Sequence, residues 1–420
     1  MTPEVRDRIE QIRHGNVPEG YKKGKIGIVP VEWDEVPFST LFASTSEYTD
    51  DLEQYPLYSL TIEDGITAKT ERYERSHLVK KENSYKVVRP NDYAYNPMNI
   101  RFGAVARHKG DIPVAVSGYY DIFTTIHESD RAFMDSFLTC GPMITYYNKV
   151  STGSLIEKQR VHFSDFMEFS LALPSIEERK KIAEILTAQG RIIELKEKLL
   201  AEKQRQKKHL MQQLLTGKKR LPGFDGEWLS VAIGRFIHEL DERTTCNNQH
   251  EILSVTKNGI VRQYDHFNKQ IASEDNTGYK ILRRNNLAFS TMNLWMGSVD
   301  VLENYEIGII SPAYKVFSFD SKMMDTGFGK QLMRSEFMIW LYKSNSEQGA
   351  SVVRRNLDLK ALLSAKVKIP ALKEQLAIAT VLRAADKEID LLRQDIEQEK
   401  QKKKALMQLL LTGIVRVKGE

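Results

Sequence analysis

The 420-residue sequence has little of what secreted proteins and most enzymes carry. Its two cysteines, Cys140 and Cys246, are too few for a disulfide framework and stand at no metal-ligand spacing. Neither a Gly-x-x-x-x-Gly-Lys-Ser/Thr phosphate loop nor a His-Glu-x-x-His pair is present. No apolar run reaches the roughly 18 residues that a membrane span needs. These absences predict a cytoplasmic protein with no membrane segment, nucleotide-driven motor or metal site of its own.

The sequence also has only a small excess of positive charge. The chain has 61 Lys and Arg against 56 Asp and Glu, a net charge of +5, which only weakly favours anionic partners. Residues 174–220 carry 13 basic and 6 acidic side chains, and residues 370–418 carry 10 and 7, so the rest of the chain sums to −5. The basic excess lies in these two segments, and any nucleic-acid binding elsewhere must rely on local basic patches.

The most informative feature present is an internal repeat. Residues 174–220 align with residues 370–416 at a fixed offset of 196, and 18 of the 47 pairs are identical. Residues 85–123 align with residues 279–317 at an offset of 194, and 12 of those 39 pairs are identical. The sequence therefore predicts a tandem duplication in which a globular part precedes a helical part in each copy.

Each helical part has the composition of one long helix. The segment from Pro174 to Gly217 is rich in Glu, Lys, Gln, Leu, Ile and Ala, and Gly190 is its only interior glycine. Proline at the start and glycine at the end suit a helix of about 40 residues, roughly 60 Å long. Positions seven apart form an apolar seam, which a lysine interrupts at the same step in both copies. The seam residues are Leu186, Ile193, Leu200 and Leu214 in the first copy and Leu382, Ile389, Ile396 and Leu410 in the second.

The seam predicts that the two helices pair as an antiparallel coiled coil, because a globular domain separates them in the chain. The alternative is that each helix packs on its own globular domain. The globular parts carry short β-type runs broken by Gly, Pro, Asn and Asp, without a βαβ rhythm. We therefore expect an α/β (α+β) protein: two pseudo-twofold-related mixed α/β domains joined by a pair of long antiparallel coiled-coil helices.

The expected order along the chain follows from the repeat. It comprises a leading segment (1–29), a first domain (30–173), a first helix (174–217), a linker (218–225), a second domain (226–369), a second helix (370–413) and a tail (414–420).

Several motifs resemble those of the specificity subunits of type I restriction-modification systems. They are Met292-Asn293-Leu294-Trp295-Met296-Gly297, Ile310-Ser311-Pro312-Ala313-Tyr314, the helix entries after Leu173 and Ile369, and Leu-Leu-Thr-Gly at both helix exits. The first domain departs from the strongest motif, with Arg101 where the second has Trp295. The resemblance implies two target-recognition domains, each reading one half of an asymmetric bipartite site in double-stranded DNA. It also implies two helices that set the gap and dock two methyltransferase subunits.

The same resemblance implies that the chain is not itself an enzyme. S-adenosylmethionine, ATP and Mg would be bound by partners, namely the methyltransferase subunits and the restriction subunits recruited through them. DNA contact would come from Lys and Arg on phosphates, Arg on guanine and Asn on adenine. The candidates are Lys80, Lys81, Lys86, Arg89, Asn99, Arg101 and Arg107 in the first domain and Lys280, Arg283, Arg284, Asn293, Arg354 and Arg355 in the second.

For each candidate, a surface charge or a fold-supporting group is at least as good an interpretation. The repeated pairs Arg89/Arg283 and Asn99/Asn293 are better explained as shared fold or phosphate contacts, because reading different sequences requires the two copies to differ there. The Lys-rich stretches 203–208 and 400–404 suit a solvated or partner-docking face, with DNA contact as the alternative.

Two other functions are compatible with parts of the pattern. A two-headed adaptor would use its globular modules to bind proteins and its helices as a rod. A stand-alone DNA methyltransferase is suggested by Tyr95-Asn96-Pro97-Met98-Asn99, which resembles the Asn-Pro-Pro-Tyr loop of adenine methyltransferases. Its repeat partner, residues 289–293, lacks Asn-Pro, and no glycine-rich cofactor loop precedes either copy. Chance similarity is therefore the favoured interpretation of that motif.

Overall fold

The computed structural model describes residues 2–69, 84–155, 159–266, 273–348 and 355–417. The chain forms two compact units, one of Met1–Lys196 with Asp395–Glu420 and the other of Glu197–Gln394. Each unit combines one globular part with portions of both long helices, so neither helix belongs to a single unit.

The two long helices are α5, Ile176–Leu214, of 39 residues, and α10, Leu372–Leu411, of 40 residues. The hydroxyl of Ser175 accepts a hydrogen bond from the backbone N–H of Glu178, which caps the start of α5. Gly217 and Gly413 follow the two helices with φ of 69° and 71°, the left-handed conformation that commonly ends a helix. Local sequence signals thus set the start of α5 and the ends of both helices.

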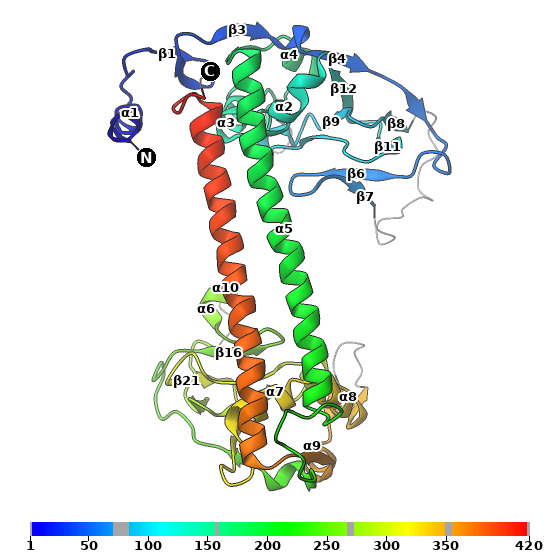
Figure 1. Ribbon diagram of the computed structural model, residues 1–420, viewed down its shortest axis with the longest axis vertical. Helices are drawn as coiled ribbons and strands as arrows, with labels where there is room; N and C mark the ends of the chain where they lie inside the picture. The colour runs from blue at the N-terminus through cyan, green and yellow to red at the C-terminus, as the bar shows by residue number, and fades with distance from the viewer. Residues whose placement is uncertain (1, 70–83, 156–158, 267–272, 349–354, 418–420) are drawn as a thin grey trace. The chain divides into compact units, whose positions relative to one another are not determined.

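Within each unit the two helices run side by side and antiparallel (Figure 1). In the first unit, Gln189 Nε2 lies 2.6 Å from Glu399 Oε2, and Lys196 Nζ lies 2.8 Å from Asp395 Oδ2. In the second unit Lys203 Nζ lies 2.6 Å from Glu388 Oε1. Residue numbers rise along α5 as they fall along α10, which confirms the predicted antiparallel pair.

The predicted seam is largely buried. All its residues have low exposure except Leu200, which is half-buried. The ends of the seam also join the domain cores: Leu186 and Leu410 pack into the core of the first unit, and Leu214 and Leu382 into that of the second. The helices therefore pair along their middle and pack on globular domains at their ends, so the two packing alternatives coexist.

An arginine that follows each helix binds a glutamate at the start of the other. Arg416 donates to Glu178 at 2.8 and 2.9 Å in the first unit, and Arg220 donates to Glu374 at 2.6 and 2.7 Å in the second. Both glutamates are buried. We call these two bidentate pairs the helix-end locks; they are related by the repeat and tie each helix end to the opposite helix.

The strands of both units repeat one topology, and all their ladders are antiparallel. The first unit has a four-stranded sheet, β10-β9-β12-β4 (Val105–Arg107, Tyr93–Tyr95, Asp121–Thr125, Phe42–Thr45), and the second has β20-β19-β22-β15 (Val299–Val301, Leu287–Ser290, Tyr314–Phe319, Ile237–Leu240). The ladder β11-β8 (Val114–Ser117, Tyr85–Val88), to which β5 (Tyr48–Thr49) adds, corresponds to β21-β18 (Ile307–Ile310, Lys280–Arg283). The hairpin β6-β7 (Tyr58–Thr61, Gly65–Ala68) corresponds to β16-β17 (Leu253–Thr256, Gly259–Arg262), and the pair β13-β3 (Ser170–Leu173, Asp34–Pro37) to β25-β14 (Lys366–Ile369, Leu229–Ala232).

The remaining elements accompany these sheets. In the first unit they are α1 (Pro3–Arg13), β1 (Tyr21–Gly24), β2 (Gly27–Pro30), α2 (Arg131–Phe137), α3 (Gly141–Val150) and α4 (Phe163–Met167). In the second unit they are α6 (Gln263–His266), α7 (Thr326–Met333), α8 (Glu336–Ser344), β23 (Ser346–Gln348), β24 (Arg355–Leu357) and α9 (Leu359–Ser364).

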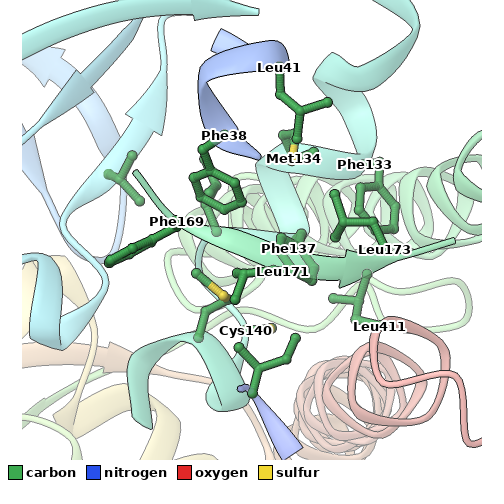
Figure 2. Close-up of a cluster of buried hydrophobic side chains, with 14 of the residues drawn as sticks. Phe38, Leu41, Phe133, Met134, Phe137, Cys140, Phe169, Leu171, Leu173 and Leu411 are labelled. Atoms are coloured by element: carbon green, nitrogen blue, oxygen red, sulfur yellow. The ribbon is translucent and has the colours of Figure 1, made fainter. Parts of the chain in front are cut away.

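The core of the first unit is aromatic. Figure 2 shows Phe38, Phe133 and Phe137 around β13, with Leu411 of α10 reaching the same cluster. Cys140 lies in this cluster, and burial raises the pKa of its thiol to about 11. A thiol held neutral in this way is a packing group, not a nucleophile.

Candidate nucleic-acid interface

Two of the predicted DNA-contacting lysines are buried instead. Lys86 of β8 and Lys280 of β18 are equivalent positions of the repeat. Lys86 Nζ donates to the carbonyl of Tyr120 at 2.8 Å, and Lys280 Nζ lies 3.3 Å from Asp241 Oδ1. Their side chains are 9% and 4% exposed, so a phosphate cannot reach the ammonium groups without displacing these partners. Their placement favours a fold-supporting role.

The repeated arginines Arg89 and Arg283 are exposed but engaged. Arg89 makes two hydrogen bonds to Glu47, at 2.7 and 3.1 Å, and Arg283 makes two to Glu242, at 2.6 and 3.0 Å. The hydrogen bonds and charge of Arg283 lower the pKa of Glu242. Because the pairs are equivalent in both copies, they suit a shared framework better than the reading of different sequences.

Arg101 and Arg107 lie inside the first domain. The guanidinium of Arg101 bonds Gln159 and stacks 4.9 Å from the ring centroid of Phe102. Arg107 donates two hydrogen bonds to Asp135, at 2.8 and 2.9 Å. Burial alone would raise the pKa of Asp135, but the hydrogen bonds of Arg107 and the charge of Lys109 hold it below its ordinary value. Both arginines are therefore committed to partners in the folded domain.

The turns that carry the two asparagine candidates have the same backbone. Asn99 and Asn293 each precede a short 3₁₀ turn that ends in a left-handed glycine, Gly103 with φ of 96° and Gly297 with φ of 88°. Asn99 is exposed and Asn293 is half-buried. The residue before each glycine, Phe102 or Met296, is also exposed. The asparagines thus remain available for contact with a partner.

The other candidates belong to the second unit or lie outside the described residues. Arg284 is about half-exposed and lies 3.0 Å from Glu306. Arg355 is half-buried; its guanidinium lies 5.5 Å from the ring centroid of Trp295, and Nη1 donates to the carbonyl of Ser346 at 3.1 Å. Three candidates, Lys80, Lys81 and Arg354, lie outside the described residues.

One face of α5 carries an exposed apolar stripe beside the buried seam. Its members in the first unit are Ile185, Ile192 and Leu195, which are 37%, 40% and 54% exposed. Spacings of seven and three residues place them along one side of the helix. A second helix could pack on this side, which we call the α5 stripe.

The described residues contain neither a metal-holding cluster nor a membrane-spanning helix. Within these ranges no group of three or more His, Cys, Asp or Glu side chains is arranged to hold a metal ion. In the same parts of the chain, no helix combines the length and apolar character of a membrane span.

Comparison with known proteins finds curated relatives and similar solved structures, while no family model matches. The type I restriction enzyme MjaVIII specificity subunit of Methanocaldococcus jannaschii is 25% identical over 277 residues, which are 60% of this chain and 64% of that protein. A putative type I restriction enzyme MjaX specificity subunit of the same organism is 44% identical over 70 residues, 17% of this chain and 16% of that protein. The matches thus span less than two thirds of either relative.

The solved structures cover almost the whole chain. A chain from a structure on complex assembly and conformational transition of the type I restriction-modification system aligns with a TM-score of 0.54 and 14% identity, over 92% of this chain and 99% of the other. The type I specificity subunit from M. genitalium aligns with a TM-score of 0.52 and 12% identity, over 90% and 96%. The chain resembles type I specificity subunits. The resemblance seen in the sequence and the predicted fold class are both confirmed.

Within this specificity-subunit fold, sequence reasoning missed the helix-end locks. Arg220 and Arg416 stand at the same step of the repeat, and so do Glu178 and Glu374. The repetition of both the arginine and the glutamate could have predicted the locks, because an ion pair that occurs in both copies indicates a shared structural role. The individual contact of Arg416 with Glu32, at 2.8 Å, has no such signature in the sequence.

Proposed function

We propose that this chain is the non-catalytic DNA-recognition subunit of a type I restriction-modification complex. Each domain would read one half of an asymmetric bipartite site. The observation that carries the proposal is the duplication itself. One strand topology occurs in both units, each unit has one helix-end lock, and most aligned positions of the two globular parts carry different residues. Two similar heads with different side chains suit two different half-sites in similar grooves.

In this proposal the helix pair separates the two reading domains. A continuous helix of 39 residues is roughly 60 Å long, at about 1.5 Å per residue. The length of the paired helices would therefore set the number of base pairs between the half-sites.

The partners supply the chemistry. Two methyltransferase subunits, which bind S-adenosylmethionine, would dock on the chain, and the ATP- and Mg-dependent restriction subunits would join through them. The α5 stripe supports docking, because exposed apolar side chains at helical spacing suit a partner helix. The complex would work in the cytoplasm.

DNA binding would depend steeply on salt in this proposal. The chain outside residues 174–220 and 370–418 sums to a charge of −5, so phosphate contacts would have to come from local cationic groups. The exposed Arg89 and Arg283 are such groups, although each is paired with a glutamate in the free chain. Phosphate contacts release counterions, and affinity then falls linearly with salt on a double-logarithmic scale.

The test uses the purified chain assembled with its methyltransferases and a library of random duplexes at several salt concentrations. The proposal expects enrichment of one gapped motif, with affinity that falls as salt rises. Equal binding to all duplexes would contradict the proposed recognition function and favour the two-headed adaptor. Binding of S-adenosylmethionine by the isolated chain would instead support the stand-alone enzyme.

A further inference from the structure

The second unit has a large groove between the helix pair and its globular part. The groove has a volume of about 1450 Å³ and is lined by α5, α10, α7, the turn of the hairpin β16-β17 and the residues that follow β20. All of these residues belong to the one unit Glu197–Gln394. The lining carries nine Lys and Arg side chains but only five Asp and Glu side chains. The groove therefore has a surplus of four positive charges, which we trace to particular residues.

The acidic side chains of the groove are all neutralised within the groove itself. Each of the five forms an ion pair with a different cation of the same lining. Glu336 Oε1, for example, lies 2.6 Å from Lys208 Nζ, and Asp300 Oδ1 lies 3.0 Å from Arg334 Nη1. These pairs account for five of the nine cations and leave four without an acidic partner in the lining.

The four remaining cations are Lys218 after α5, Lys257 at the tip of the hairpin β16-β17, and Arg383 and Lys387 on α10. All four are exposed, and none forms an ion pair with any Asp or Glu of the described residues. A Cβ atom built on Gly327 of α7 would lie 2.6 Å from Arg383 Nη2, so glycine at that position leaves room for the guanidinium. Three separate elements thus bring unneutralised cations to one groove.

The first unit has no equivalent surplus at the cleft beside its corresponding hairpin, β6-β7. That cleft has a volume of about 550 Å³, and its described lining carries two Lys and Arg side chains against four Asp and Glu side chains. The hairpin tip there is Glu63-Asp64, whereas the tip in the second unit is Lys257-Asn258. The repeat partners of Arg383, Lys218 and Lys387 are Thr187, Ile414 and Arg191. The cationic groove is therefore a property of the second unit and not of the shared framework.

We propose that this groove binds the sugar–phosphate backbone of the DNA that the second domain reads, so that the helix pair itself contacts DNA. Lys and Arg side chains bind phosphates without reading sequence. Protein–protein interfaces are depleted of lysine and enriched in aromatic residues, whereas this lining has six lysines and a single aromatic residue, Phe337. The inference rests on the proposed function for the presence of DNA. It adds that the two half-sites are held unequally, with additional backbone contacts in the second unit.

The experiment measures duplex binding by the chain assembled with its methyltransferases at several salt concentrations. The first double variant, Arg383→Gln with Lys387→Gln, removes two cations from α10. The matched control, Lys373→Gln with Lys404→Gln, removes two exposed cations of the same helix that lie outside the groove lining. The control therefore has the same net charge as the double variant. Both should keep the Tm of the wild type, because all four side chains are exposed.

The double variant on α10 should reduce the slope of log affinity against log salt by about 0.9 for each phosphate contact that is lost, and the control should leave the slope unchanged. A second double variant, Lys218→Gln with Lys257→Gln, removes the cations from the other two elements of the groove and should reduce the slope in the same way. The methylated motif should stay the same in every variant, because phosphate contacts carry no sequence information.

A slope that is reduced in either groove variant and not in the control supports the DNA groove. Slopes equal to that of the control in both groove variants would overturn it. If those equal slopes came with weaker binding of methyltransferase in the absence of DNA, the groove would instead hold an acidic segment of the partner protein. A wild-type complex without sequence preference would overturn the proposed function, while the slopes, which are measured on duplexes of any sequence, would still decide the groove.

Discussion

The two units share a framework and differ in charge. Helix-end locks, the pairs Arg89–Glu47 and Arg283–Glu242, and the left-handed Asn91 and Asn285 with φ of 74° and 69° occur in both. The side chains that differ include Arg101 against Trp295, Gly190 against Asp386 and Lys109 against Glu303. Repeated contacts suit a shared framework, and in the proposed function the positions that differ are those at which two half-sites could be distinguished.

The largest effects are expected at the helix-end locks. Glu178→Gln and Glu374→Gln each remove the charge of a buried carboxylate and should destabilise the protein by about 3 kcal/mol, because an arginine is left without its counter-ion. Glu374→Gln should cost more than Glu178→Gln, since Arg416 keeps Glu32 as a second partner. Denaturant unfolding of both variants measures the difference. Glu177→Gln, at an exposed neighbouring position, is the control. An equal loss of stability in the control would show that the helix-end locks are not the cause.

The next effect is expected on assembly. Ile192→Asp with Leu195→Asp places two charges on the α5 stripe and should weaken methyltransferase binding at least tenfold, because a charge cannot be buried unpaired against an apolar partner. Fold stability should hardly change, because both side chains are exposed. Lys180→Asp, an exposed site on the same helix, is the control. Unchanged binding in a pull-down or titration with methyltransferase would exclude this face as the docking surface.

A smaller effect, on DNA sequence preference, should distinguish arginines that are repeated in both copies from those that are not. Arg284 has Pro90 at its repeat position, whereas Arg283 repeats Arg89. Arg284→Ala should lower affinity about tenfold and relax sequence preference in the second half-site alone, as expected for loss of a base contact worth about 1–3 kcal/mol. Arg283→Ala should weaken binding of all sequences alike. Selection from a randomised duplex library distinguishes these results, and identical motif changes in both variants would contradict the comparison.

The smallest effect concerns acid stability in the first unit. Hydrogen bonds from Lys196 and Gln189 lower the pKa of Glu399 from 4.5 to about 2. A depressed folded-state pKa means that this carboxylate stabilises the fold above about pH 4.5, and the contribution is lost as pH falls toward 2. Glu399→Gln should therefore unfold more readily than the wild type at neutral pH, and the two unfolding midpoints should converge near pH 2. Curves that stay parallel across this range would exclude the link.

Local signals made the helices predictable. Helix composition, the caps and the heptad seam indicated segments 174–217 and 370–413, and the structure has helices at Ile176–Leu214 and Leu372–Leu411. The repeat also predicted that the two helices pair, because two similar apolar seams without another partner are expected to pack on each other. Leu200 is more exposed than a seam residue should be, because a seam pattern does not specify how close the partner lies at each step.

The candidate contacts were harder to predict because their partners are distant in sequence. Arg107 and Lys86 have the residue type that binds phosphate, yet their carboxylate partners, Asp135 and Asp121, lie 28 and 35 residues away along the chain. Burial of a charged side chain depends on such non-local pairs, which only the assembled sheet brings together. For Arg89 and Arg283, repetition indicated a shared fold role or a phosphate contact, and the equivalent glutamate partners of the two arginines suit the first of these.

The most direct test of two unlike reading domains on one helix pair is a map of methylated adenines. DNA exposed to the chain with its methyltransferases should carry the mark in one asymmetric, gapped motif. A matched insertion of seven residues in the paired middles of α5 and α10 should lengthen the gap by about three base pairs, since seven residues add roughly 10 Å. Both half-sites should stay the same. A palindromic or ungapped motif, or a gap that the insertion leaves unchanged, would contradict the account.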